Sequence, residues 1–269
     1  MNSIVHDLPG LFYGLVVGVS LGLTGGGGSI FAVPLLIYGL GIPVRSAIGL
    51  SLAVVGAMAG FGAMLRLKAR EVDVRSGIVF ALGGMLLAPT GTWIGHAIPS
   101  ALILSCFAVL MTFVGWRMWI GGVEASGEVG PCVIRGNGKP SPSCYTRLAS
   151  AGAAAGLLSG LFGVGGGFII VPALLYVTGT TIHRAVATSL LVIFLISLSG
   201  VGASLVQGQV FPMPASALFL AGGLLGMVAG GALRSKLSGP ALRKVFAAAM
   251  WAVGAYMLLQ NLTPFLPKR

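Results

Sequence analysis

Six apolar stretches constrain this chain more than any other feature. Each has roughly 20 residues or more, and they lie at 43–66, 74–97, 99–121, 181–206, 214–236 and 239–260. A helix rises 1.5 Å per residue, so about 20 residues cross the roughly 30 Å hydrocarbon core of a bilayer. Charged residues make up only 8% of the chain, against about 25% in soluble domains. The sequence therefore predicts an all-α, polytopic membrane protein.

Consecutive glycines interrupt the element that precedes each set of three stretches. The sequence "GLTGGGGSIFAVP" spans residues 22–34, and "GLFGVGGGFIIVP" spans 160–172. Glycine costs a helix about 1 kcal/mol relative to alanine, so each run should break its helix. We expect the broken elements, 8–40 and 148–178, to form hairpins whose second arms are too short to cross a bilayer.

The chain contains an internal duplication. Residues 14–53 align without gaps on 152–191, and about 15 of the 40 positions are identical. Such repeats are common in transporters. The polar, Gly- and Pro-rich stretch between the copies has the composition of a loop. We therefore divide the chain into a first membrane repeat (1–122), a linker (123–147) and a second membrane repeat (148–269).

The basic loops indicate that the two repeats have opposite orientations. In the first copy the basic loop follows the stretch 43–66 and contains Arg66, Lys68, Arg70 and Arg75. In the second copy the basic residues fall one loop later, after 214–236, and are Arg234, Lys236, Arg243 and Lys244. Cytoplasmic loops collect Lys and Arg. An inverted repeat needs an odd number of crossings, which three spans plus one re-entrant hairpin per copy satisfy, as would five spans. We expect a cytoplasmic linker and both termini outside, in the inner (plasma) membrane of a bacterium.

The glycine turns are the candidate binding site. Unpaired amides near the middle of a bilayer must line a cavity or bind a ligand, and helix N-termini favour anions. Two facing turns would bind an anion without a charged side chain, through Gly25, Gly27, Gly28 and Ser29 in the first copy and Gly163, Gly165, Gly166 and Gly167 in the second. The alternative is tight helix packing. It applies best to the glycines at GxxxG spacing (Gly14, Gly18 and Gly22; Gly152, Gly156 and Gly160).

Polar residues at the start of the next helix extend the candidate site. The segments "RSAIGLSL" (45–52) and "RAVATSLL" (184–191) contain Arg45, Ser51, Arg184, Thr188 and Ser189. An arginine at a helix N-terminus is not favoured by the helix dipole, so it could serve to attract an anion. It could equally extend to the lipid headgroups, and the sequence leaves both readings open.

The remaining residues argue against other functional classes. All five acidic residues lie outside the six stretches, whereas cation pathways usually need an intramembrane carboxylate. We expect no enzyme activity, cofactor or metal, because the His and Cys residues form no catalytic pair or ligand spacing. The expected partners are a small anion and the lipid bilayer, without nucleic acid. An anion channel with the same site, and a homo-oligomer, both remain compatible with the sequence.

The duplicated unit resembles the TauE/SafE-type sulfite exporters, a family of membrane permeases. The resemblance rests on "GLLSGLFGVGGGFIIVPALL" (156–175), on "HRAVATSLL" (183–191), and less closely on the first copy. It covers essentially the whole chain apart from the linker. It implies transport, usually export, of small sulfur-containing or organic anions such as sulfite and sulfonates. The matching glycines of both turns would then line the pathway.

Overall fold

The computed structural model describes residues 2–120, 142–209, 213–233 and 239–262, and this part of the chain consists of helices joined by turns and loops, with no strand. The two copies have the same order of elements, as the duplication predicts. The first comprises α1 (Asn2–Thr24), the short segments η1 (Gly27–Phe31), α2 (Ala32–Pro34) and η2 (Leu35–Gly39), α3 (Val44–Lys68), α4 (Val74–Ala97) and α5 (Ser100–Ile120). The second comprises α6 (Pro142–Phe162), α7 (Gly167–Thr178), α8 (Ile182–Val206), α9 (Met213–Leu233) and α10 (Gly239–Leu262).

The helices break at the predicted glycines. Helix α1 ends at Thr24 and α6 ends at Phe162, so each glycine run separates a long first arm from a short second arm. The second arms cover 27–39 and Gly167–Thr178. Helix α6 begins at Pro142, which lies inside the stretch assigned to the linker. Proline fits the first turn of a helix because it needs no N–H partner there. The rest of the linker, 123–141, lies outside the described residues.

Four helices in the described part are long and apolar enough to cross a membrane: Val44–Lys68, Val74–Ala97, Ile182–Val206 and Ser216–Leu233. The described apolar parts of α5 and α10, Ser100–Trp116 and Ala247–Gln260, are shorter. Large apolar side chains such as Leu86 and Trp93 are exposed on the outer surface. That distribution suits helices whose outer faces contact lipid.

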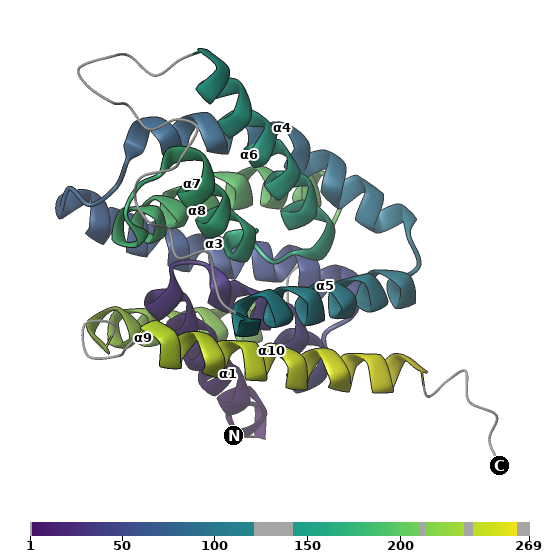
Figure 1. The fold of residues 1–269 in the computed structure, drawn as a ribbon. Helices are drawn as coiled ribbons and strands as arrows, with labels where there is room; N and C mark the ends of the chain where they lie inside the picture. Colours follow the sequence, from purple (N-terminus) through teal and green to yellow (C-terminus); the bar gives the residue numbers. More distant parts are fainter. Residues whose placement is uncertain (1, 121–141, 210–212, 234–238, 263–269) are drawn as a thin grey trace.

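Helices of one copy pack against helices of the other. Helix α1 packs along α9, and α6 packs along α4. Since α6 is the counterpart of α1 and α4 is the counterpart of α9, the same contact forms twice with the copies exchanged. In Figure 1, α4 and α6 lie together in the upper part of the molecule, and α1 crosses α9 in the lower part. Helices α3 and α8 pack on each other, and α5 packs on α10. The two copies therefore form one interlocked helical body.

Glycines at GxxxG spacing form the closest of these contacts, as the packing interpretation predicts. A Cβ atom added at Gly14, Gly18 or Gly22 would collide with the backbone of α9. A Cβ atom added at the equivalent glycines of α6 would collide with the backbone of α4 (Gly152, Gly156 and Gly160). Small residues thus allow the two backbones to touch, as in other packed membrane helices. These six glycines are structural.

Candidate functional site

Both second arms begin at a glycine turn without a side-chain cap. Gly26 precedes the segment 27–39 and Gly166 precedes α7, and neither position supplies a capping side-chain hydrogen bond. The first N–H groups of a helix have no acceptor within that helix. Gly25 and Gly166 have φ angles of 72° and 68°, which glycine adopts without steric cost. The glycines therefore allow the sharp turn and supply no capping side chain of their own.

The two glycine turns contact each other directly. A Cβ atom added at Gly26 would lie 2.7 Å from the Cα atom of Gly167. Since a Cβ atom essentially never approaches another carbon so closely, neither position could hold a larger residue without a shift of the backbone. The turns, 138 residues apart in the aligned copies, thus contact each other inside the protein.

A serine from each copy holds the turn of the other copy. The Ser189 hydroxyl of α8 donates to the Gly25 carbonyl at 2.5 Å. The Ser51 hydroxyl of α3 donates to the Gly163 carbonyl in the same way. Both serines are fully buried. Ser51 and Ser189 are equivalent residues of the duplication, so the two hydrogen bonds form a reciprocal pair that fixes both turns.

The first turn satisfies several of its own polar groups. Thr24 Oγ1 accepts from the Gly28 amide at 3.2 Å and donates to the Ser20 carbonyl at 2.8 Å. The Ser29 hydroxyl donates to the Gly26 carbonyl at 2.7 Å. These side chains close the first turn on itself.

The second turn has no such side chains. Phe162 and Gly167 occupy the positions of Thr24 and Ser29. The Ile169 and Ile170 amides both donate to the Gly166 carbonyl at 3.0 Å. The N-terminus of α7 has no side-chain cap. The second turn is therefore the more open of the two to a hydrogen-bonding ligand.

Two buried serines beside the second turn were missed by the sequence reasoning. Ser159 of α6 and Ser197 of α8 have hydroxyl groups without a hydrogen-bond partner in the described structure. A Cβ atom added at Gly166 would lie 3.4 Å from Ser159 Cβ, and one added at Gly165 would lie 3.7 Å from Ser197 Oγ. The available signal was a polar residue deep inside an apolar helix. The sequence-based prediction considered polar residues near the helix starts and therefore missed both serines.

The remaining predicted polar residues lie apart from the turns or serve another contact. Arg45 and Arg184 are exposed in the first turns of α3 and α8. The Thr188 hydroxyl oxygen accepts from the Asp73 amide at 2.9 Å, where α4 begins. Thr188 therefore joins the loop before α4 to α8. The structure brings together the predicted turn residues with Ser51 and Ser189 (Gly25, Gly27, Gly28, Ser29, Gly163, Gly165, Gly166 and Gly167).

Arg45 borders a small cavity of about 10 Å³, enough for one water molecule. Thr92 and His96 of α4 and Ser204 of α8 also line it. The Gln209 amide nitrogen lies 2.7 Å from His96 Nε2 and donates to the Arg45 carbonyl at 3.2 Å. These contacts tie the end of α8 to the start of α3. The cavity is too small for a polyatomic anion.

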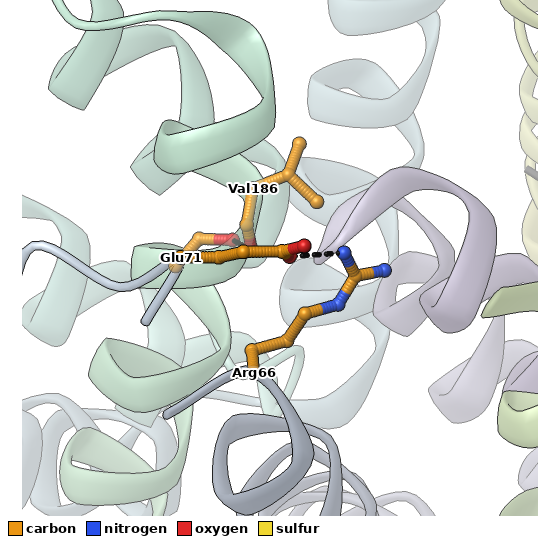
Figure 2. A network of polar contacts seen from close by, with 4 residues as sticks. Arg66, Glu71 and Val186 are labelled. Atoms are coloured by element: carbon orange, nitrogen blue, oxygen red, sulfur yellow. Dashed lines mark hydrogen bonds and ion pairs between the residues drawn. The ribbon is translucent and has the colours of Figure 1, made fainter. Parts of the chain in front are cut away.

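An ion pair lies close to the first turn. Arg66, at the end of α3, and Glu71, in the following loop, are 2.6 Å apart. Figure 2 shows this pair beside Val186 of α8. The Val186 side chain in turn occupies the space in front of Gly25. The basic loop of the first copy therefore packs over the start of α8.

No group of three or more His, Cys, Asp or Glu side chains could hold a metal ion in the part of the chain that the structure describes. At the turns, the groups that can contact a ligand include backbone amides and serine hydroxyls. Both kinds of group donate to an anionic oxygen.

Comparisons with known proteins agree on the class of protein. The family model described as "Sulfite exporter TauE/SafE" matches residues 10–257. A "Probable membrane transporter protein" of Xylella fastidiosa is 35% identical over 92% of this chain and 93% of its own length. YunE of Bacillus subtilis, also named a probable membrane transporter protein, is 26% identical over 93% of this chain and 96% of its own. No solved structure matches. The match spans both repeats and both glycine turns, so the chain belongs to the TauE/SafE sulfite exporter family of membrane transporters.

Proposed function

We propose that this protein exports small sulfur-containing or organic anions, such as sulfite or sulfonates, across the inner membrane of a bacterium. The anion binds at the glycine turns, near the middle of the bilayer. One observation supports this most directly: the turns meet at Gly26 and Gly167, and each second arm follows a glycine that supplies no capping side chain. A helix N-terminus has about half a positive charge and exposes N–H donors. Two such ends at one point favour an anion.

The proposed arrangement in the membrane has six full spans and two re-entrant hairpins. The spans are α3, α4, α5, α8, α9 and α10, and each hairpin consists of a first arm and its short second arm. The exchanged packing of α1 on α9 and α6 on α4 supports a twofold relation between the copies. The reversed positions of the basic loops support an axis in the plane of the membrane.

An anion fits the charge distribution of the chain better than a cation. The acidic residues Asp7, Glu71, Asp73, Glu124 and Glu128 all lie outside the six proposed spans, and cation pathways usually need a carboxylate inside the membrane. A monovalent anion that leaves an inside-negative cell gains about 2.3 kcal/mol per 100 mV. The membrane potential alone would then drive export.

The test is flux through purified protein in liposomes with an imposed potential, measured for sulfite, a small sulfonate and sulfate. We expect saturable sulfite and sulfonate flux, which Gly166→Leu abolishes because leucine strains a left-handed turn and fills the space beside Ser159. Gly202→Leu is the matched control, since nothing lies within 4 Å of the added Cβ atom. Wild-type flux by a folded Gly166→Leu variant would show that the turns are not the site. Flux that does not saturate would indicate a channel.

A further inference from the structure

The two glycine turns differ in one respect that bears on where the anion binds. In the first turn, Thr24 and Ser29 form hydrogen bonds with the Gly28 amide and the Gly26 carbonyl. The second copy has Phe162 and Gly167 instead, so its turn lacks both side chains. The duplication therefore kept the turn but not the side chains that satisfy it. The two turns are unequal as hydrogen-bond donors.

Buried hydroxyl groups distinguish the second turn as well. The Ser159 and Ser197 side chains are 0% and 1% exposed, and neither hydroxyl has a partner in the described structure. Buried polar groups are almost always hydrogen-bonded, so an unpaired one needs an explanation. Both serines adjoin the glycines that precede α7, one beside Gly166 and the other facing Gly165. Two helices thus each place a serine with an unpaired hydroxyl beside the second turn, at neighbouring glycines.

The space at these two glycines is less crowded than at Gly163 in the same turn. A Cβ atom added at Gly165 would first meet the Ile193 side chain at 3.1 Å, and one added at Gly166 would first meet the Ala155 carbonyl at 3.2 Å. At Gly163 the nearest atoms lie at 2.7 Å and belong to backbone. The second turn is therefore less tightly packed at Gly165 and Gly166, next to the two serines, than at Gly163 or at Gly167, which contacts Gly26.

We propose that the second turn is the anion-binding turn, and that Ser159 and Ser197 donate hydrogen bonds to the bound anion beside the first amides of α7. The inference rests on the proposed function and deepens it, because it assigns the site to one turn and names its side-chain donors. The ligand must accept hydrogen bonds from several directions, as the oxygens of a sulfite or sulfonate group do. Arg45 and Arg184 are exposed, so neither places a buried positive charge beside the serine and amide donors. A monoanion is therefore favoured over a dianion, whose second charge would be buried without compensation.

The test is the apparent KM of sulfite and methanesulfonate transport in liposomes for Ser159→Ala, Ser197→Ala and the double variant, with binding to the purified protein measured by calorimetry. We expect each single substitution to raise KM and Kd about tenfold, because a hydrogen bond to a charged group is lost. Ser204→Ala is the control. Ser204 lies on α8 with Ser197 and is equally buried, but its hydroxyl already donates to the Gly200 carbonyl. We expect this variant to keep the wild-type KM.

The outcomes separate this inference from the proposed function. If the double variant transports and binds both anions as the wild type does, the serines are structural and the inference is wrong, while the proposed function stands. If Ser29→Ala raises KM as much as the double variant, both turns share the anion and the assignment to one turn is wrong. If the folded wild type neither binds nor moves either anion, the proposed function fails instead.

Discussion

The reciprocal serines show how single residues join the two copies. Ser51 and Ser189 each donate to a carbonyl of the opposite turn. The sequence was enough to select both residues, because they are equivalent polar positions in apolar helices. Their partners could not be predicted, because the partner of a buried hydroxyl depends on how helices from distant parts of the chain pack. The same dependence explains why Ser159 and Ser197 were missed.

Removing either reciprocal hydroxyl should destabilise the protein. Ser189→Ala leaves the buried Gly25 carbonyl without its donor, and an unsatisfied buried group costs about 1–3 kcal/mol. We expect the free energy of unfolding to fall by about that amount, measured by denaturation of the purified protein in detergent. Thr90→Ala is the control, because the Thr90 hydroxyl is exposed and bonds only to its own helix. Equal stability of the two variants would contradict the structural role of Ser189.

At the scale of elements, the glycine stripe of α1 could be identified from its spacing, but not the helix that it contacts. Any small-residue surface can accept a neighbouring backbone. The partner, α9, follows from the arrangement of the copies and is separated from α1 by most of the chain. The breaks at the glycine runs could be predicted because they depend on local backbone preferences. Local signals thus defined the helices, and long-range packing decided their neighbours.

The α1–α9 contact provides a prediction at this scale. Gly18→Ala places a methyl group against the backbone of Gly223, which cannot shift as a flexible side chain would. Gly231→Ala in α9 is the matched control, because its added Cβ atom has nothing within 4 Å. Both changes gain about 1 kcal/mol in helix propensity. We expect Gly18→Ala to lower the apparent melting temperature and Gly231→Ala to maintain or raise it. A Gly18→Ala variant as stable as the control would show that α1 and α9 do not touch at this point.

At the scale of the whole molecule, the distribution of basic residues decides which side of the membrane each loop faces. With six spans and a cytoplasmic linker, all but three of the 16 Lys and Arg residues fall on the cytoplasmic side; the exceptions are Arg45, Lys268 and Arg269. This bias follows the positive-inside rule. The duplicated sequence alone does not give the orientation, because the aligned segments are similar whichever way each copy is inserted.

The proposed inverted arrangement predicts that equivalent loops are reached from opposite sides. Arg70 and Gly208 are equivalent positions in the loops after α3 and α8, and both are exposed with left-handed φ angles. In a protein whose own cysteines are replaced by serine, we expect a membrane-impermeant maleimide to label Gly208→Cys in intact spheroplasts and Arg70→Cys only in inside-out vesicles. Labelling of both positions from one side would exclude the inverted repeat. Exactly reversed labelling would keep the inversion but place the linker outside.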